Sequence, residues 1–154
     1  MTGPFELKLR QFAAKAKGNA DAAVRAVVLE VASRLIVRSP VDTGRFRGNW
    51  FYSLDRLEQA AIGGTAEGAA AIYQGGGATA YSTTVNNIGE LPITAGGHVH
   101  YLQNNLPYAM RLEYGFNGTD SLGRSYSQAP RAFVRLTLAE FKQITDGAAR
   151  AVAK

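Results

Sequence analysis

Residues 104–115 (NNLPYAMRLEYG) hold the densest mixture of aromatic, apolar, charged and turn-forming side chains in the chain. A strand-like run at 98–102 enters the stretch, Gly115 closes it, and a helical pattern opens at Pro130. The stretch contains no nucleophile beside a base, no metal-ligand cluster and no phosphate-binding loop. We therefore interpret it as an architectural element, in which 108–114 form a strand or a helical turn.

Two helices are predicted before this stretch. Residues 5–17 place apolar side chains at helical spacing, and Pro4 suits a first turn. Gly18 interrupts the pattern, and Asn19 suits the N-cap of a second helix over 20–37. This second helix carries one apolar stripe, formed by Val24, Val27, Val28, Val31 and Leu35.

A proline turn separates the helices from the first predicted strand. Pro40 disfavours helical backbone at the residue before it, so the second helix is expected to end there. In the tight turn that follows, Asp42 and Thr43 bond nearby amides and Gly44 permits a positive φ. Residues 50–54 (WFYSL) then have the aromatic content of a strand.

The other segments are loops and short elements. Residues 55–97 form a variable, glycine-rich loop region, with a short strand at 69–73 and a short helix at 80–88. Residues 115–128 read as a loop because they are rich in Gly, Ser, Asn and Asp. The last helix opens at Pro130 and has one stripe, formed by Val134, Leu138, Phe141, Ala148 and Val152.

These elements predict a single α+β domain over residues 1–154. Long N-terminal helices and a C-terminal helix are expected to pack on a small, mainly antiparallel β-sheet. A length of 154 residues with 46% hydrophobic side chains suits one domain with a real core. No apolar run is long enough to span a membrane and no signal-peptide core is present, which predicts assembly in the cytoplasm. The absence of cysteine excludes disulfides and thiolate metal sites.

The charge is unevenly distributed. Residues 1–50 hold nine Lys or Arg against four acids, which accounts for the whole net charge of +5. A basic surface in this third of the chain suits nucleic acid, an acidic protein partner or a solvated helix face. Phe46 lies between Arg45 and Arg47, where an aromatic ring either stacks on bases or fills a core.

Three groups of residues invite a catalytic or metal-binding interpretation. Residues 42–44 (DTG) match the aspartic-protease triplet, but no second carboxylate and no preceding apolar strand accompany them, which favours a turn. His98 and His100 alternate on one predicted strand face, but the third ligand of a metal site is missing. Glu113 is a lone acid in an apolar setting, to be satisfied by Arg111 or by an arginine of another chain. We predict no catalytic, cofactor-binding or metal-binding residue.

Three blocks of the chain together resemble a known family. They are 39–50 (SPVDTGRFRGNW), 104–115 (NNLPYAMRLEYG) and 128–134 (QAPRAFV), the last of which opens the final helix. Their order and spacing, and the chain length, are similar to those of the small tail-completion and neck proteins of tailed bacteriophages and prophages. The motifs do not separate tail-terminator, tail-completion and adaptor-like members of this group.

The resemblance implies a virion structural protein without enzymatic activity. Such proteins assemble as a ring, often six-fold, at the head-proximal end of the tail. They contact the tail tube protein and the head–tail connector proteins, and DNA passes through the lumen. Structural roles are implied for Pro40, Asp42, Thr43, Gly44, Pro107, Tyr108, Glu113, Gly115 and Pro130. Candidates for a subunit interface or the lumen are Arg45, Arg47, Arg111 and Glu113.

The stretch at 104–115 is thereby predicted to be a sheet-and-turn element. Its apolar side chains Tyr108, Leu112 and Tyr114 are expected to pack beneath the last helix. Its charged side chains Arg111 and Glu113 are expected to face solvent or a neighbouring subunit.

Overall fold

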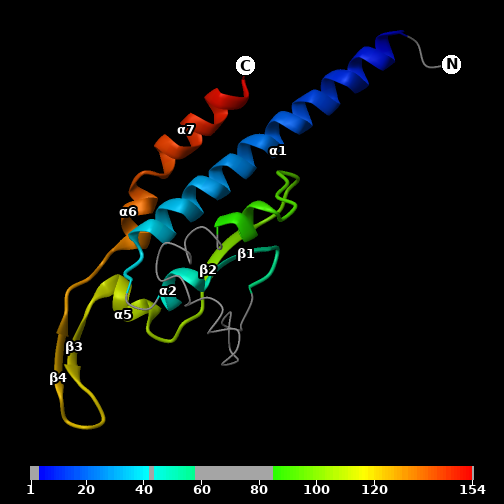
Figure 1. Ribbon diagram of the computed structural model, residues 1–154. Helices are drawn as coiled ribbons and strands as arrows, with labels where there is room; N and C mark the ends of the chain where they lie inside the picture. The colour runs from blue at the N-terminus through cyan, green and yellow to red at the C-terminus, as the bar shows by residue number, and fades with distance from the viewer. Residues whose placement is uncertain (1–3, 42–43, 58–84, 154) are drawn as a thin grey trace.

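The computed structural model describes residues 4–41, 44–57 and 85–153. A long N-terminal helix, two strand pairs and two C-terminal helices dominate these segments (Figure 1). The labelled elements in chain order are α1 Pro4–Arg38, α2 Arg45–Gly48, β1 Trp50–Leu54, β2 His100–Asn104, α5 Ala109–Tyr114, β3 Phe116–Thr119, β4 Ser125–Gln128, α6 Phe133–Ala139 and α7 Phe141–Val152. The predicted α+β class is confirmed.

Helix α1 is one uninterrupted helix of 35 residues. The predicted break between two helices at Gly18 and Asn19 is therefore wrong. A glycine inside a helix costs about 1 kcal/mol relative to alanine, whereas ending and renucleating a helix leaves backbone groups unpaired on both sides of the break. Continuation through Gly18 is thus favoured. The predicted start at Pro4 is confirmed, and the predicted end before Pro40 is also confirmed.

The core lies beneath the C-terminal half of α1. Helices α6 and α7 pack along this half of α1, and the β1–β2 pair closes the core below it (Figure 1). The buried apolar side chains of the core are Val28, Ala32, Leu35, Ile36, Phe46, Trp50, Tyr52, Ile88, Ile93, Leu106 and Phe133. The N-terminal half of α1 extends beyond the rest of the molecule, and every residue from 5 to 20 is exposed.

Strands β1 and β2 pair antiparallel, with Trp50 opposite Asn104 and Leu54 opposite His100. The strand predicted at 50–54 is confirmed, whereas the strand predicted at 98–102 begins two residues later. The shift has a local cause at Asp55, which adopts a φ of 60° and ends the regular ladder.

Strands β3 and β4 form a separate antiparallel hairpin, with Phe116 opposite Gln128. The prediction of a loop over 115–128 is wrong for these residues. The turn is built by Asp120, whose carboxylate accepts hydrogen bonds from the Leu122 and Arg124 amides. A side chain that satisfies turn amides in this way lets two short polar strands pair. The described strands therefore form two small sheets rather than the single sheet predicted.

The last helix is broken at Glu140 into α6 and α7, which the sequence pattern did not predict. The Glu140 amide donates to the Thr137 carbonyl at 3.2 Å in a tight final turn of α6. The predicted stripe is accordingly divided. Ala148 is buried, whereas Leu138 and Phe141 are largely exposed.

The variable region 55–97 lies mostly outside the described residues, as does the strand predicted at 69–73. The helix predicted at 80–88 is helical over 85–89, where Ile88 enters the core. Of the two alternatives for 108–114, the helical one is correct over Ala109–Tyr114. The description of this stretch as part of a sheet is therefore wrong.

Candidate functional site

The aromatic side chains of the three motif blocks meet in one cluster. The Phe46 ring lies 5.4 Å from Phe133, 5.9 Å from Tyr108 and 6.2 Å from Trp50, measured between ring centroids. Trp50 and Phe133 are also in edge-to-face contact, at 6.0 Å. Such pairs stabilise a core beyond the burial of their area. Phe46 is therefore a core side chain, and the base-stacking interpretation of this ring is wrong.

Hydrogen bonds fix the first block to the end of α1. The buried Ser39 hydroxyl donates to the Leu35 carbonyl at 2.7 Å and accepts the Trp50 indole N–H at 2.8 Å. The Arg47 guanidinium donates to the carbonyls of Val37 and Ser39, at 2.7 Å and 3.2 Å. Carbonyls at a helix C-terminus lack partners inside the helix, so Arg47 acts as a cap for α1.

The predicted turn after Pro40 is partly visible. Gly44 adopts a φ of 88°, as expected for a glycine at this position. Asp42 and Thr43 lie outside the described residues, so their expected turn bonds remain a prediction. Arg45 is exposed beside this turn, and its place at a subunit interface or in the lumen remains a prediction.

The second and third blocks are joined by their backbones. The Arg131 amide donates to the Leu112 carbonyl at 2.9 Å, and the Ala132 amide donates to the Glu113 carbonyl at 3.1 Å. Gly115, with a φ of 80°, lets the two segments come this close. A Cβ at this position would lie 2.7 Å from the Gln128 carbonyl oxygen and 2.9 Å from the Pro130 nitrogen.

Glu113 is the charged residue at the centre of this junction, and only 4% of its surface is exposed. Its carboxylate accepts hydrogen bonds from the amides of Val134 and Arg135, at 2.9 Å and 3.2 Å. The Arg135 guanidinium donates to the same carboxylate at 3.0 Å. Glu113 thus caps the first turn of α6 from a distant segment, and Ala132, at the N-cap position, makes no side-chain bond. The prediction that Glu113 faces solvent, or pairs with Arg111, is wrong.

The other side chains of 108–114 are placed as follows. Leu112 packs against the core, as predicted, and Tyr108 contacts Phe46. Tyr114 is largely exposed and stacks under the Arg135 guanidinium, which contradicts its predicted burial. Arg111 is exposed, as predicted, with its guanidinium 4.4 Å from the centre of the Phe116 ring.

The two histidines do not form a pair. His98 Nδ1 lies 2.6 Å from the Asp55 carboxylate, outside the strand. His100 Nδ1 lies 2.8 Å from the Tyr52 hydroxyl, within the strand pair. Hydrogen bonds from the Val99 amide and then from His98 hold the pKa of Asp55 below its ordinary value. Among the described residues, no three metal-ligating side chains cluster.

A charged clamp joins α1 to the break between α6 and α7. The Glu140 carboxylate accepts from the Arg38 guanidinium at 2.7 Å and 2.8 Å, and it also pairs with Arg34. Arg38 further donates to the Thr137 hydroxyl at 3.0 Å. The Arg38 bond, followed by the Arg34 bond, lowers the pKa of Glu140 from its ordinary 4.5. Arg34 also pairs with Glu30 on the same helix, at 2.7 Å.

The clamp predicts a pH dependence of stability. Because the folded state lowers the pKa of Glu140, its stabilisation is present above pH 4.5 and is lost as pH falls through the lower, folded value. We expect Glu140→Gln to lower the melting temperature at pH 7, and we expect this difference from the wild type to shrink below pH 4.5. Thermal unfolding followed by circular dichroism at both pH values measures it. Glu6→Gln, in the exposed pair with Arg10, should change little at either pH.

Seven of the nine basic residues of the N-terminal third fall into two groups. Arg25, Arg34, Arg38 and Arg47 bind carbonyls or carboxylates of this chain. The lysines Lys8, Lys15 and Lys17 lie on the exposed half of α1. Much of the excess charge therefore holds the fold together.

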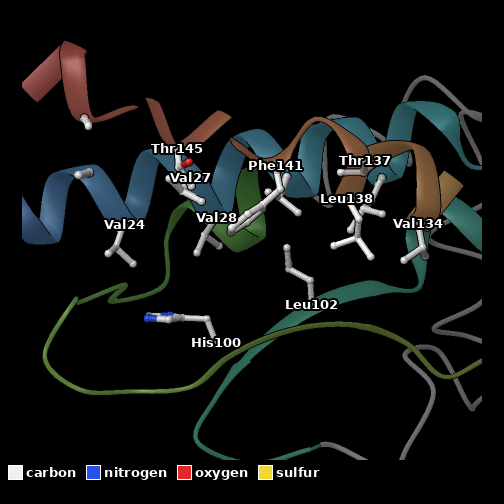
Figure 2. Close-up of a pocket in the computed structure, with 14 residues that line it drawn as sticks. Val24, Val27, Val28, His100, Leu102, Val134, Thr137, Leu138, Phe141 and Thr145 are labelled. Carbon is white, nitrogen blue, oxygen red and sulfur yellow. The ribbon is translucent and has the colours of Figure 1, made fainter. Parts of the chain in front are cut away.

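An apolar groove of about 590 Å³ lies between α1, β2 and the helices α6 and α7 (Figure 2). One wall is α1 between Ala23 and Leu35, the floor includes Leu102 of β2, and the other wall includes Leu138 and Phe141. Figure 2 shows the labelled valine, leucine and phenylalanine side chains converging on the groove from these elements. It is a surface for apolar contact, with few polar groups to orient a reacting molecule.

Sequence reasoning missed Arg135, Glu140 and the groove. These features depend on residues that are close only in the folded chain. Arg135 is 22 residues from Glu113, and Glu140 is 102 residues from Arg38. No known protein family, curated protein or solved structure matches this chain. Within the described residues, no helix is both long and apolar enough to cross a membrane.

Proposed function

We propose that the chain is a structural virion protein of a tailed phage or prophage. In this proposal its copies form a ring at the head-proximal end of the tail, complete the tail and join it to the head. Its partners are then further copies of itself, the tail tube protein and the head–tail connector proteins, with DNA in the lumen.

One observation carries the proposal. The three blocks that resemble the neck and tail-completion proteins lie far apart in the sequence, and they form one junction in the fold. Within that junction Ser39, Phe46, Glu113 and Gly115 have structural contacts that account for their residue types. The motifs are thus explained as parts of a scaffold, which is what a ring subunit needs.

The exposed apolar surface gives separate support. Phe5, Leu9 and Phe12 on α1, and Leu138 and Phe141 beside the groove, are each about half exposed or more. Large exposed apolar patches mark protein contacts in soluble proteins. A subunit of an assembly accounts for them, whereas a solitary basic nucleic-acid-binding module does not.

Deletion of the gene from a phage or prophage that encodes this chain tests the proposal. We expect unattached heads and tails in electron micrographs of the lysate, and we expect joined particles when the wild-type gene is supplied from a plasmid. Joined, infectious particles without the protein would refute the proposal. DNA binding by the pure protein that weakens steeply with salt, in a protein absent from virions, would favour the nucleic-acid-binding alternative.

A further inference from the structure

The N-terminal half of α1 carries an apolar stripe whose side chains are exposed and extend beyond the rest of the described chain. We call residues 5–20 the arm. Phe5, Leu9, Phe12 and Ala16 follow one another at spacings of four, three and four, so they lie on one helix face. Phe5 is 78% exposed and Phe12 is 71% exposed. Packing this stripe on an apolar surface would remove it from water and stabilise the arm.

The arm cannot reach the groove of its own chain. The groove wall runs from Ala23 to Leu35 on α1, and the arm is the same unbroken helix continued toward its N-terminus. A helix does not fold back on itself without breaking. An arm that lies in the groove therefore comes from another chain.

The dimensions of arm and groove agree. The stripe from Phe5 to Ala16 spans eleven residue steps, or about 16 Å at the helical rise, and the wall from Ala23 to Leu35 spans twelve, or about 18 Å. The side chains of Phe5 and Phe12 alone account for about 300–500 Å² of surface. Docking would cover these side chains together with Leu9 and the apolar lining of the groove.

We propose that the arm of one copy docks into the groove of a second copy. Each chain then has one arm and one groove, so the contact between copies is head-to-tail. Successive contacts of this kind can close into a ring, and two chains can also exchange their arms. The contact deepens the proposed function because it gives the ring its subunit interface. It rests on that function only for what the assembled copies do in the virion.

Cross-linking between two variants tests the contact, because the wild-type chain contains no cysteine. Phe12→Cys in the arm is mixed with Leu138→Cys in the groove, one of them carrying a mass tag, and a short bis-maleimide is added. We expect a product of mixed mass. Leu136→Cys is the matched control, since Leu136 is 51% exposed on the same helix but does not line the groove. Equal yields with Leu136→Cys, or no mixed product, would overturn the proposal.

Light scattering over a concentration series gives the second measurement. Phe12→Glu should weaken self-association about tenfold or more, because it places a charge in an apolar contact. Gln11→Glu adds the same charge to the exposed arm outside the stripe of Phe5, Leu9, Phe12 and Ala16, and it should leave self-association unchanged. A wild-type chain that stays monomeric, or equal effects of both variants, would overturn the contact and leave a virion role standing. Absence from virions would refute the function and leave a measured contact standing.

Discussion

Gly115→Ala is expected to destabilise the protein by about 3–5 kcal/mol, because it combines a strained backbone with a steric clash. Gly115 adopts a φ of 80° and a ψ of 172°, a region that is almost restricted to glycine. Its new Cβ would lie within 3 Å of the backbone of Gln128 and Pro130. Urea denaturation followed by circular dichroism measures the free energy of unfolding.

Gly123→Ala is the matched control for this prediction. Gly123 has a φ of 77°, but a Cβ at this position meets nothing within 4 Å. Its cost should be limited to the backbone strain, about 1–2 kcal/mol. Equal losses in the two variants would show that the approach of Gly115 to the third block contributes nothing.

Glu113→Ala is expected to destabilise the protein by about 2–4 kcal/mol, because it leaves the first amides of α6 without their acceptor. Glu113→Gln keeps one acceptor oxygen and should lose roughly half as much. The Arg135 side chain is 50% exposed, so Arg135→Ala should cost only about 1 kcal/mol. Chemical denaturation of the three variants separates the cap from the ion pair.

Glu6→Ala serves as the control for the loss of a carboxylate. Glu6 pairs with Arg10 on the exposed arm, and its removal should change stability by less than about 0.5 kcal/mol. An unchanged stability for Glu113→Ala would contradict the structural role of the junction. A loss for Arg135→Ala as large as that for Glu113→Ala would assign the stabilisation to the ion pair instead.

Local patterns in the sequence predicted the elements whose formation depends on near neighbours. The valine stripe on the second half of α1, the aromatic strand from Trp50 and the left-handed glycine at position 44 follow from spacing and backbone sterics. In the first block the chain leaves α1 and enters a strand at Trp50, as expected, whereas the last helix begins at Phe133 and not at Pro130. The helical form of 109–114 was left open between two alternatives, because a six-residue apolar run has no decisive period.

Contacts between distant segments decided the features that were missed. Glu113 was assigned to the surface because its neighbours in sequence offered only Arg111, whereas the amides of α6 bury it. The Glu140 carboxylate, at the break between α6 and α7, binds Arg34 and Arg38, which lie about a hundred residues earlier. Gly18 failed to break α1 because its penalty is smaller than the loss of hydrogen bonds at a new helix end.

The position of the protein in the virion tests the central proposal most directly. Particles of a phage that encodes this chain can be labelled with a gold-tagged antibody against it and imaged by electron microscopy. The proposal predicts label at the junction between head and tail, and on the head-proximal end of tails that have not yet joined. Particles that carry no label, or that carry it only on the capsid or at the tail tip, would contradict it.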